Sequence, residues 1–206
     1  EQFSIPDRNN GYTILSSENQ RTGAEDWRDT TYLREKYLSS TEDVISKMDG
    51  SDELVEFVDA AGNKSSGKPA DAAIYLDKSA RPVEWFVKKF WDALSEGGTD
   101  MPVSHFLNID RKYWFMSQGH TESEAEHLEP YCFKVDEVPR SVINSIRTLF
   151  VVGDLPEENW MGEVENLPTI LDGKNVMIVD EVSNTGSTLI IAQQLLRRAI
   201  PEARFG

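Results

Sequence analysis

The chain has 206 residues, and its 21 lysines and arginines against 36 aspartates and glutamates give a formal net charge of −15. This length suits one large domain with room for an insertion, and 39% apolar residues with 28% charged ones exclude a fibrous or wholly disordered protein. The charge disfavours nucleic acid and anionic membranes as partners outside a local basic pocket. Cys132 is the only cysteine, which excludes an internal disulfide framework and leaves too few thiolates for a zinc ribbon.

The hydropathy pattern indicates a cytoplasmic protein. No run approaches the roughly 18 apolar residues that a membrane span needs. Residues 1–10 lack a basic region followed by an apolar stretch, and the lone cysteine agrees with a reducing compartment. We therefore expect a cytoplasmic protein without a membrane partner.

Residues 1–70 are expected to form an N-terminal helical extension. Ser40 and Asp43 resemble the start of a capping box, and Gly50 stands where a helix would end. Small, polar and turn-forming residues fill positions 60–70. A loop and a domain boundary are therefore predicted near residue 70.

A strand–helix–strand unit is predicted to follow. The apolar run of residues 72–76 is typical of a strand, and Pro82 suits the first turn of a helix. Residues 103–109 then alternate loosely as a second strand, so parallel pairing in an α/β sheet is the expected outcome. The apolar stripe of the intervening helix consists of Val83, Phe86, Val87, Phe90 and Leu94.

Two further regions complete the chain. Residues 113–172 break the strand–helix rhythm and are interpreted as a long insertion. Residues 176–179 are fully apolar, as a buried central strand requires, and a helix that ends before Pro201 follows them. A further strand is expected to begin at Phe205, with more residues after the printed sequence.

The segment 176–189 carries the strongest functional signal, because a buried strand there delivers polar residues to the edge where open α/β sheets bind ligands. Asp180 and Glu181 suit sugar hydroxyls or a hydrated Mg²⁺ ion. The hydroxyl-rich loop of residues 183–188, in which Gly186 allows close backbone approach, suits a phosphate at the start of a helix. Two acids beside a phosphate site indicate a phosphorylated sugar as ligand.

This segment resembles the phosphoribosyl-pyrophosphate (PRPP) binding motif of the type I phosphoribosyltransferases. Four apolar residues, two acids and a Thr-Gly loop ending in Ser or Thr occur in the family's order, between a strand and a helix. The resemblance implies that Asp180 and Glu181 are catalytic residues that contact the ribose hydroxyls. The residues implied to bind the 5′-phosphate of PRPP are Ser183, Asn184, Thr185, Gly186, Ser187 and Thr188.

The resemblance covers residues 71–206 and implies a type I phosphoribosyltransferase-like α/β fold, with a parallel sheet flanked by helices. The insertion at 113–172 would take the place of the mobile loop that covers the site in this family. The start of the helix after the first core strand would attract pyrophosphate together with two cations, and a solvated turn is the alternative for that loop. The residues implied to bind pyrophosphate are Lys78, Ser79, Ala80 and Arg81.

The implied function is that of an Mg²⁺-dependent phosphoribosyltransferase, a glycosyltransferase of nucleotide metabolism. A nitrogen nucleophile would displace pyrophosphate from the anomeric carbon of PRPP through an oxocarbenium-like transition state, which the protein positions and stabilises. Mg²⁺, bound through PRPP and the two acids, would neutralise the leaving group. The acceptor is an unidentified base or amine, and the oligomeric state stays open, with a homodimer as one option.

Two departures from the motif favour a different function. Glu181 stands where the family usually has Asp, and Asn184 stands where purine-using members often have Asp near the acceptor base. Both favour a PRPP- or nucleotide-sensing regulatory protein without turnover. Lys78 and Arg81 favour the enzyme, because a sensor of a nucleotide monophosphate needs no pyrophosphate loop.

Three other patterns are interpreted as structural. Residues 62–68 spell the first seven positions of a P-loop, but Pro69 replaces the required Ser or Thr. The histidines and the cysteine within residues 120–132 lie among acids at no zinc-binding spacing, which favours a solvated segment. The aromatic residues within 85–91 follow helical spacing, which favours core packing over base stacking.

Overall fold

The computed structural model describes residues 30–76, 80–96, 98–153, 155, 164–180 and 187–206. The chain divides into two compact units, Glu1–Asp43 and Val44–Gly206, and each is described by itself. The described part of the first unit belongs to helix α2, Thr30–Asp49. Within the described residues, no helix combines the length and the apolar character needed to cross a membrane.

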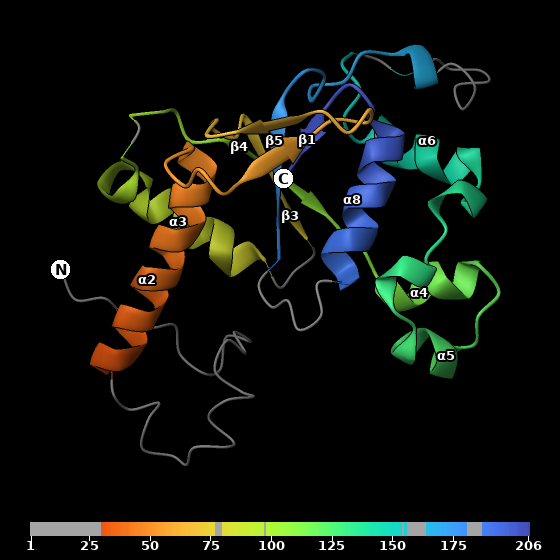
Figure 1. Cartoon of the computed structure of the whole chain (residues 1–206), viewed down its shortest axis with the longest axis horizontal. Helices are drawn as coiled ribbons and strands as arrows, with labels where there is room; N and C mark the ends of the chain where they lie inside the picture. The colour runs from red at the N-terminus through yellow and green to blue at the C-terminus, as the bar shows by residue number, and fades with distance from the viewer. Residues whose placement is uncertain (1–29, 77–79, 97, 154, 156–163, 181–186) are drawn as a thin grey trace. The chain divides into compact units, whose positions relative to one another are not determined.

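A six-stranded mixed sheet forms the centre of the second unit, in the order β2-β1-β6-β5-β3-β4 (Figure 1). The neighbours β6, β5, β3 and β4 are parallel, whereas β1 and β2 form an antiparallel hairpin that attaches to β6. The predicted α/β class is confirmed, and the sheet is parallel only in part. The strands are β1 (Glu56–Val58), β2 (Lys64–Ser66), β3 (Ala72–Leu76), β4 (Val103–Leu107), β5 (Asn175–Val179) and β6 (Arg204–Phe205).

Helices cover both faces of this sheet. Helix α3 and the last residues of α2 pack on one face, and α4, α5, α6 and α8 pack on the other. The α-helices are α3 (Arg81–Leu94), α4 (Arg111–Ser117), α5 (Glu122–His127), α6 (Arg140–Thr148) and α8 (Ser187–Ala199). The described 3-10 turns are η3 (Pro130–Cys132), η4 (Val135–Glu137) and η5 (Val164–Asn166).

The central strands supply two separate cores, because successive side chains of a strand point to opposite faces. Tyr75 and Met177 pack on the α3 side, whereas Ile74 and Ile178 pack on the α8 side. Every residue of β3 is buried. A strand covered on both faces needs a continuous apolar sequence, and this is why residues 72–76 could be predicted as a strand.

The predicted strand–helix–strand unit is confirmed. Strand β3 pairs in parallel with β4, and α3 connects them. Within the predicted stripe of α3, Val87 is buried and Val83, Phe90 and Leu94 are partly buried against the same core. Strand β6 contains Phe205 and pairs in parallel with β5, so the strand predicted there is also confirmed.

Residues 60–70 differ from the sequence-based expectation. The predicted loop of residues 60–70 contains β2, which pairs with β1. Backbone pairing along the sheet edge, which a polar sequence does not reveal, stabilises this hairpin. Gly62 lies between β1 and β2 with a φ of 84°, so the P-loop-like residues 62–68 belong to a hairpin.

The described part of the predicted insertion, residues 113–153, 155 and 164–172, contains a helical layer on the α8 side of the sheet. Phe115 of α4 and Ile143 of α6 are buried in the core beneath α8. The resemblance implied a mobile loop over the site at this place in the chain. The described residues instead pack against α8, and residues 156–163 lie outside the described part.

Candidate functional site

The two segments predicted to bind PRPP leave the sheet from neighbouring strands. Strands β3 and β5 are parallel, with Tyr75 paired to Val179 near their carboxyl ends. From β3 the chain crosses to β4 on one side, and from β5 it crosses to β6 on the other. The strand order therefore reverses between β3 and β5, and open α/β sheets bind ligands in the crevice at such a reversal.

The helices that follow these strands start at the same edge from opposite faces of the sheet. Helix α3 follows β3 and packs in one core, whereas α8 follows β5 and packs in the other (Figure 1). Right-handed crossovers that run in opposite directions produce this arrangement. The N-terminal ends of both helices, with their partial positive charge, therefore lie at the carboxyl edge of the sheet.

Of the residues predicted to contact the ribose and the 5′-phosphate, the structure describes Asp180, Ser187 and Thr188. Asp180 follows β5 directly and is partly buried at the carboxyl edge. Ser187 is the first residue of α8, and Thr188 is partly buried beside it. The other predicted residues of this segment lie outside the described part of the chain, and they are Glu181, Ser183, Asn184, Thr185 and Gly186.

The predicted pyrophosphate loop is described at its helical end, while Lys78 and Ser79 lie outside the described residues. Ala80 is fully buried and occupies the N-cap position of α3. Its methyl side chain cannot accept a hydrogen bond from the first N–H groups of the helix, so these donors need a backbone oxygen, water or an anion as partner. A helix start without a side-chain cap is suited to phosphate.

Arg81 is exposed, and its guanidinium group lies over the ring of Phe106, 5.4 Å from the ring centroid. Phe106 belongs to β4, which lies on the side of β3 away from β5. Arg81 therefore rests on β4, on the side of β3 away from β5. A cation–π contact at an exposed site contributes about 0.5–1 kcal/mol, so a bound anion can draw this side chain away.

A buried polar pair that the sequence analysis did not single out lies near Arg81. Tyr75 is fully buried and packs against Phe106, with ring centroids 5.7 Å apart. Burial raises the pKa of Tyr75, and the nearby carboxylate of Glu84 raises it further. The phenol therefore stays protonated and cannot serve as a general base. The sequence signals that could have identified these two residues were a Tyr within an apolar strand and a Glu on the buried side of α3.

The predicted Mg²⁺ ion would need ligands from PRPP itself. No group of three His, Cys, Asp or Glu side chains that could hold a metal ion occurs among the described residues. Mg²⁺ in phosphate-binding sites is usually held by one or two carboxylates together with substrate oxygens. Asp180 fits such shared coordination, because its carboxylate is partly exposed at the edge where the pyrophosphate would lie.

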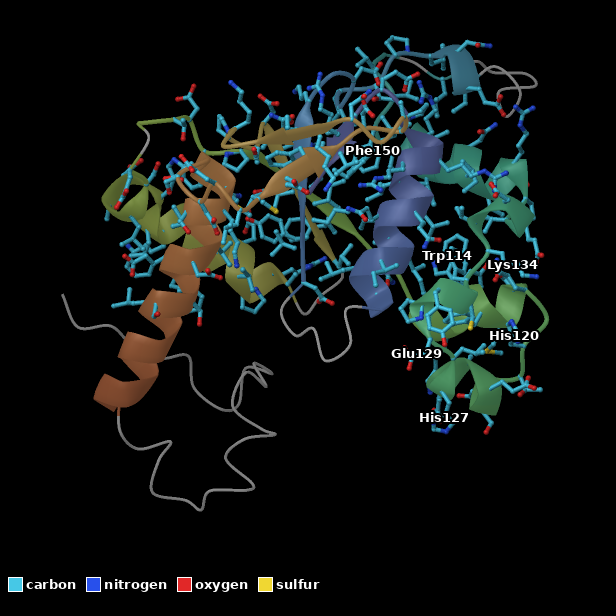
Figure 2. The ribbon with its side chains drawn as sticks, in the orientation of Figure 1. Trp114, His120, His127, Glu129, Lys134 and Phe150 are labelled. Carbon is cyan, nitrogen blue, oxygen red and sulfur yellow. The ribbon has the colours of Figure 1, made fainter. Side chains whose placement is uncertain are left out.

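Side chains within residues 120–132 have structural partners in the α4–α5 region (Figure 2). His120 packs edge-on against Phe115, with ring centroids 5.9 Å apart. Glu126 forms an ion pair with Lys112. These contacts agree with the interpretation of this segment as structural.

Among the aromatic residues of α3, Trp91 is buried and donates a hydrogen bond from its indole nitrogen to the carbonyl oxygen of Thr99 at 3.0 Å. Phe86 and Phe90 stack with centroids 6.3 Å apart, whereas Trp85 is 52% exposed. The predicted core packing is confirmed for Trp91 and does not extend to Trp85.

The candidate site therefore consists of the carboxyl edge of β3 and β5, with Asp180 directly after β5 and the start of α3 after β3. Comparisons with known protein families, curated proteins and solved structures found no match to this chain. The assignment of this site depends on the PRPP-like motif and on the place of its two ends in the sheet.

Proposed function

We propose that the chain is an Mg²⁺-dependent phosphoribosyltransferase of the type I-like fold, with PRPP bound between the carboxyl ends of β3 and β5. The observation that carries the proposal is the reversal of strand order at these two strands. The carboxyl ends of β3 and β5 lie side by side, and the segments that follow them are the two that the PRPP-like motif predicts for the phosphate-bearing ends of one ligand.

The proposed reaction is a displacement at the anomeric carbon of PRPP. A bond forms from the nitrogen atom of the acceptor to this carbon, while the bond from the carbon to the pyrophosphate oxygen breaks. Asp180 and Glu181 hold the ribose hydroxyls, and the segment up to Thr188 holds the 5′-phosphate. The N-terminal ends of α8 and α3 stabilise the 5′-phosphate and the pyrophosphate, which supplies positioning and charge stabilisation. When bound, Mg²⁺ would supply charge neutralisation for the leaving pyrophosphate, and Asp180 would help to hold it.

Calorimetric titration with PRPP tests the binding step. We expect saturable PRPP binding that requires Mg²⁺ and is tighter than the binding of ribose 5-phosphate or pyrophosphate alone, because PRPP engages both segments at once. Failure to bind PRPP or either half of it, with Mg²⁺ present, would overturn the proposal.

A double substitution tests the assigned carboxylates. Asp180→Asn with Glu181→Gln should weaken PRPP binding at least about tenfold, since two charge-assisted contacts to the ribose are lost. The Tm should change little, because Asp180 lies at the partly exposed end of a strand. The matched control is Asp136→Asn with Glu137→Gln, another adjacent Asp–Glu pair, which is exposed in η4. Equal PRPP affinity of both double variants contradicts the site.

A PRPP- or nucleotide-sensing protein without turnover is the second candidate. The contact of Arg81 with Phe106, on the β4 side of β3, favours it because this arginine is turned away from the crevice. The departures from the family motif at Glu181 and Asn184 also favour a sensor without turnover. Release of pyrophosphate in the presence of a panel of bases and amines supports the enzyme, and tight PRPP binding without release across the panel supports the sensor.

A further inference from the structure

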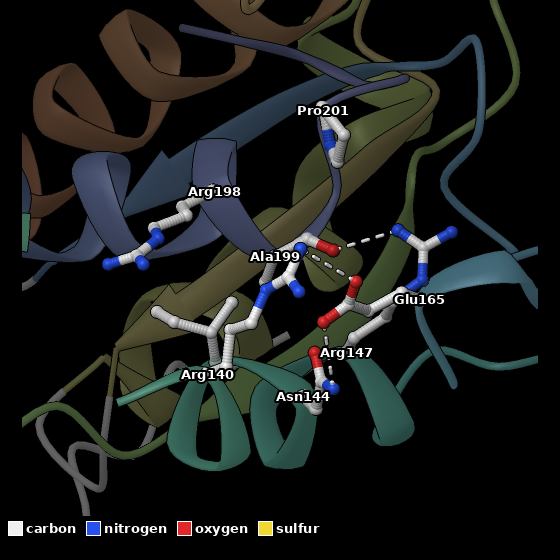
Figure 3. Close-up of a pocket in the computed structure, with 8 residues that line it drawn as sticks. Arg140, Asn144, Arg147, Glu165, Arg198, Ala199 and Pro201 are labelled. Atoms are coloured by element: carbon white, nitrogen blue, oxygen red, sulfur yellow. Dashed lines mark hydrogen bonds and ion pairs between the residues drawn. The ribbon is translucent and has the colours of Figure 1, made fainter. Parts of the chain in front are cut away.

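A cavity of about 300 Å³ lies between α6, η5 and the C-terminal end of α8 (Figure 3). Helix α8 starts at the carboxyl edge of the sheet and ends at this cavity. Its 13 residues span about 20 Å, so the cavity is separate from the candidate PRPP site. The polar side chains that line it are Arg140, Asn144, Arg147, Glu165 and Arg198.

Arg147 forms part of the frame of this cavity. Its side chain is only 5% exposed, and its guanidinium group donates to the carbonyl oxygens of Val164 at 3.0 Å, Ala199 at 2.8 Å and Leu167 at 2.8 Å. It also pairs with Glu202 at 3.3 Å. A guanidinium group has five N–H donors, so these four acceptors occupy nearly all of its capacity. Arg147 therefore has its charge balanced by Glu202 and offers no free hydrogen-bonding edge to a ligand.

Arg140 and Arg198 are engaged much less. The Arg140 side chain is 80% exposed and extends to Glu165 through Nη2 at 3.1 Å (Figure 3). Arg198 donates through Nη1 to the carbonyl oxygens of Val135 and Val138. Within the described part of the chain, these contacts use one nitrogen of each guanidinium group. The remaining N–H groups can bind a carboxylate or phosphoryl oxygen.

Glu165 is the only acid that lines the cavity in the described structure. One of its carboxylate oxygens pairs with Arg140, and the other accepts from Asn144 at 3.3 Å. An ion pair with such an exposed arginine contributes little to stability, so another anion can replace Glu165 as the partner of Arg140. Because Glu202 balances the charge of Arg147, Arg140 and Arg198 against Glu165 leave this cavity with one net positive charge, in a chain whose net charge is −15.

The other side of the cavity is apolar and is formed by Ile143, Ala199 and Pro201. A carbon skeleton can pack there while acidic groups meet the guanidinium groups. We propose that this cavity binds a small organic anion with two or more acidic groups, held by Arg140 and Arg198 and packed against this apolar wall. This inference does not depend on the proposed phosphoribosyltransferase activity.

Citrate and 3-phosphoglycerate are suitable probes, the first with carboxylates only and the second with a phosphoryl group as well. We expect at least one of them to bind saturably in calorimetry at constant ionic strength, while acetate, with a single acidic group, does not. Failure of both probes to bind at about 10 mM, which corresponds to an affinity too weak for a formed site, overturns the proposal.

Two substitutions should change this binding in opposite directions. Arg140→Gln should weaken it about tenfold, since one charge-assisted contact is lost. Glu165→Gln should strengthen it, because the competing partner of Arg140 becomes neutral. The matched control is Lys64→Gln, which removes another exposed cation of an ion pair, that with Glu56. A structural role of the pair would not produce opposite changes in affinity.

The place of binding is checked independently of the PRPP site. Binding that survives in Arg140→Gln and disappears in the Asp180→Asn, Glu181→Gln double variant overturns the proposal, because the probe then occupies the carboxyl edge. Protection from phenylglyoxal, mapped by mass spectrometry on the intact wild-type protein, gives the second readout. The probe should protect Arg140 and Arg198, and protection confined to Arg81 would also overturn the assignment.

Discussion

The two edges of the parallel strands differ in how their backbone groups are satisfied. At the amino edge, the carboxylate of Asp71 accepts from the backbone N–H of Asn175 at 2.8 Å, and the N–H of Asp71 donates to the carbonyl oxygen of Asn175 at 2.8 Å. The carbonyl of Asp71 also accepts from Val103, so one residue links the starts of three strands. At the carboxyl edge, Ala80 leaves the start of α3 without a side-chain acceptor.

Side chains also bind the backbone at or just after the C-terminal ends of the two crossover helices, α3 and α8. The carboxylate of Asp49, the last residue of α2, accepts hydrogen bonds from the backbone N–H groups of Ser51 at 2.9 Å and Glu96 at 2.8 Å. Glu96 lies just after the end of α3. Arg147 donates to the carbonyl of Ala199, the last residue of α8. Side chains thus stabilise the amino edge of the sheet, whereas the N-cap residue of α3 at the carboxyl edge, Ala80, makes no side-chain hydrogen bond to its helix. Substitutions at the amino edge should therefore change stability, and those at the carboxyl edge should change binding.

Arg147 should show the largest effect on folding. Arg147→Met leaves the carbonyl oxygens of Val164, Leu167 and Ala199 without their buried donor and should lower the free energy of unfolding by about 3–5 kcal/mol. Urea denaturation measures the change. Arg140→Met, at the exposed side of the same helix, is the control and should change the value by less than about 1 kcal/mol. Equal changes in the free energy of unfolding for Arg147→Met and Arg140→Met would contradict the stabilising role of the buried side chains at the amino edge.

Gly50 should show the next largest effect, where the end of α2 approaches the chain before β3. Its φ is 81°, and a Cβ atom there would lie 2.8 Å from the backbone C of Lys68 and 2.8 Å from the N of Pro69. We expect Gly50→Ala to destabilise the fold by about 2–4 kcal/mol, through strain and overlap together.

Gly62 is the matched control for this substitution. It has a φ of 84° but no atom within 4 Å of its Cβ position, so only the backbone strain of about 1–2 kcal/mol remains. Thermal or urea unfolding of both variants separates overlap from strain. A Gly62→Ala variant as unstable as Gly50→Ala would show that the close approach at Pro69 contributes nothing.

Asp49 should show a smaller effect that depends on pH. Burial acts to raise the pKa of Asp49, but hydrogen bonds from Ser51, Glu96 and Ser95 outweigh it and hold the pKa below its ordinary value of 3.8. The ionised carboxylate therefore stabilises the fold above pH 3.8, and this stabilisation is lost as the pH falls through the folded-state pKa. Asp49→Asn should cost about 1–2 kcal/mol at pH 7.

Urea unfolding at pH 7, 5 and 3 tests the linkage at Asp49. The difference in stability between wild type and Asp49→Asn should be constant from pH 7 to 5 and shrink toward pH 3. A difference that grows toward pH 3 has the wrong sign and would refute the assigned hydrogen bonds.

Arg81 should show the smallest effect on folding and a clear effect on binding. Arg81→Gln removes an exposed contact with Phe106 and should change the free energy of unfolding by less than about 1 kcal/mol. PRPP affinity should fall far more than ribose 5-phosphate affinity if this arginine moves onto the pyrophosphate. Calorimetry of both ligands measures this, with Lys89→Gln on the same helix as control. Equal losses for the two ligands would remove Arg81 from the pyrophosphate site.

Much of the central α/β unit could be predicted because its elements carry local signals. Strands β3 and β5 are covered on both faces and are therefore continuously apolar, and α3 and α8 carry stripes at helical spacing. Strand β2, with the sequence Lys-Ser-Ser, carries no such signal and was predicted as loop. Its pairing with β1 depends on backbone hydrogen bonds that any sequence can form.

The candidate site was predictable to a different extent on its two sides. Asp180 and the start of α8 belong to one contiguous motif, so the sequence alone was enough to predict a ligand site there. The orientation of Arg81 toward Phe106 was not predictable, because the two residues belong to different elements. The buried pair of Tyr75 and Glu84 escaped notice for the same reason.

The sequence by itself determined the types of the central elements and the motif that follows β5, because both depend on neighbours within a few residues. The tertiary structure decided the strand order, and with it that the carboxyl ends of β3 and β5 lie side by side. It also decided that Arg147 would bond Ala199, 52 residues further along the chain. Such partners depend on how packed layers meet in space, and short-range sequence patterns do not predict them.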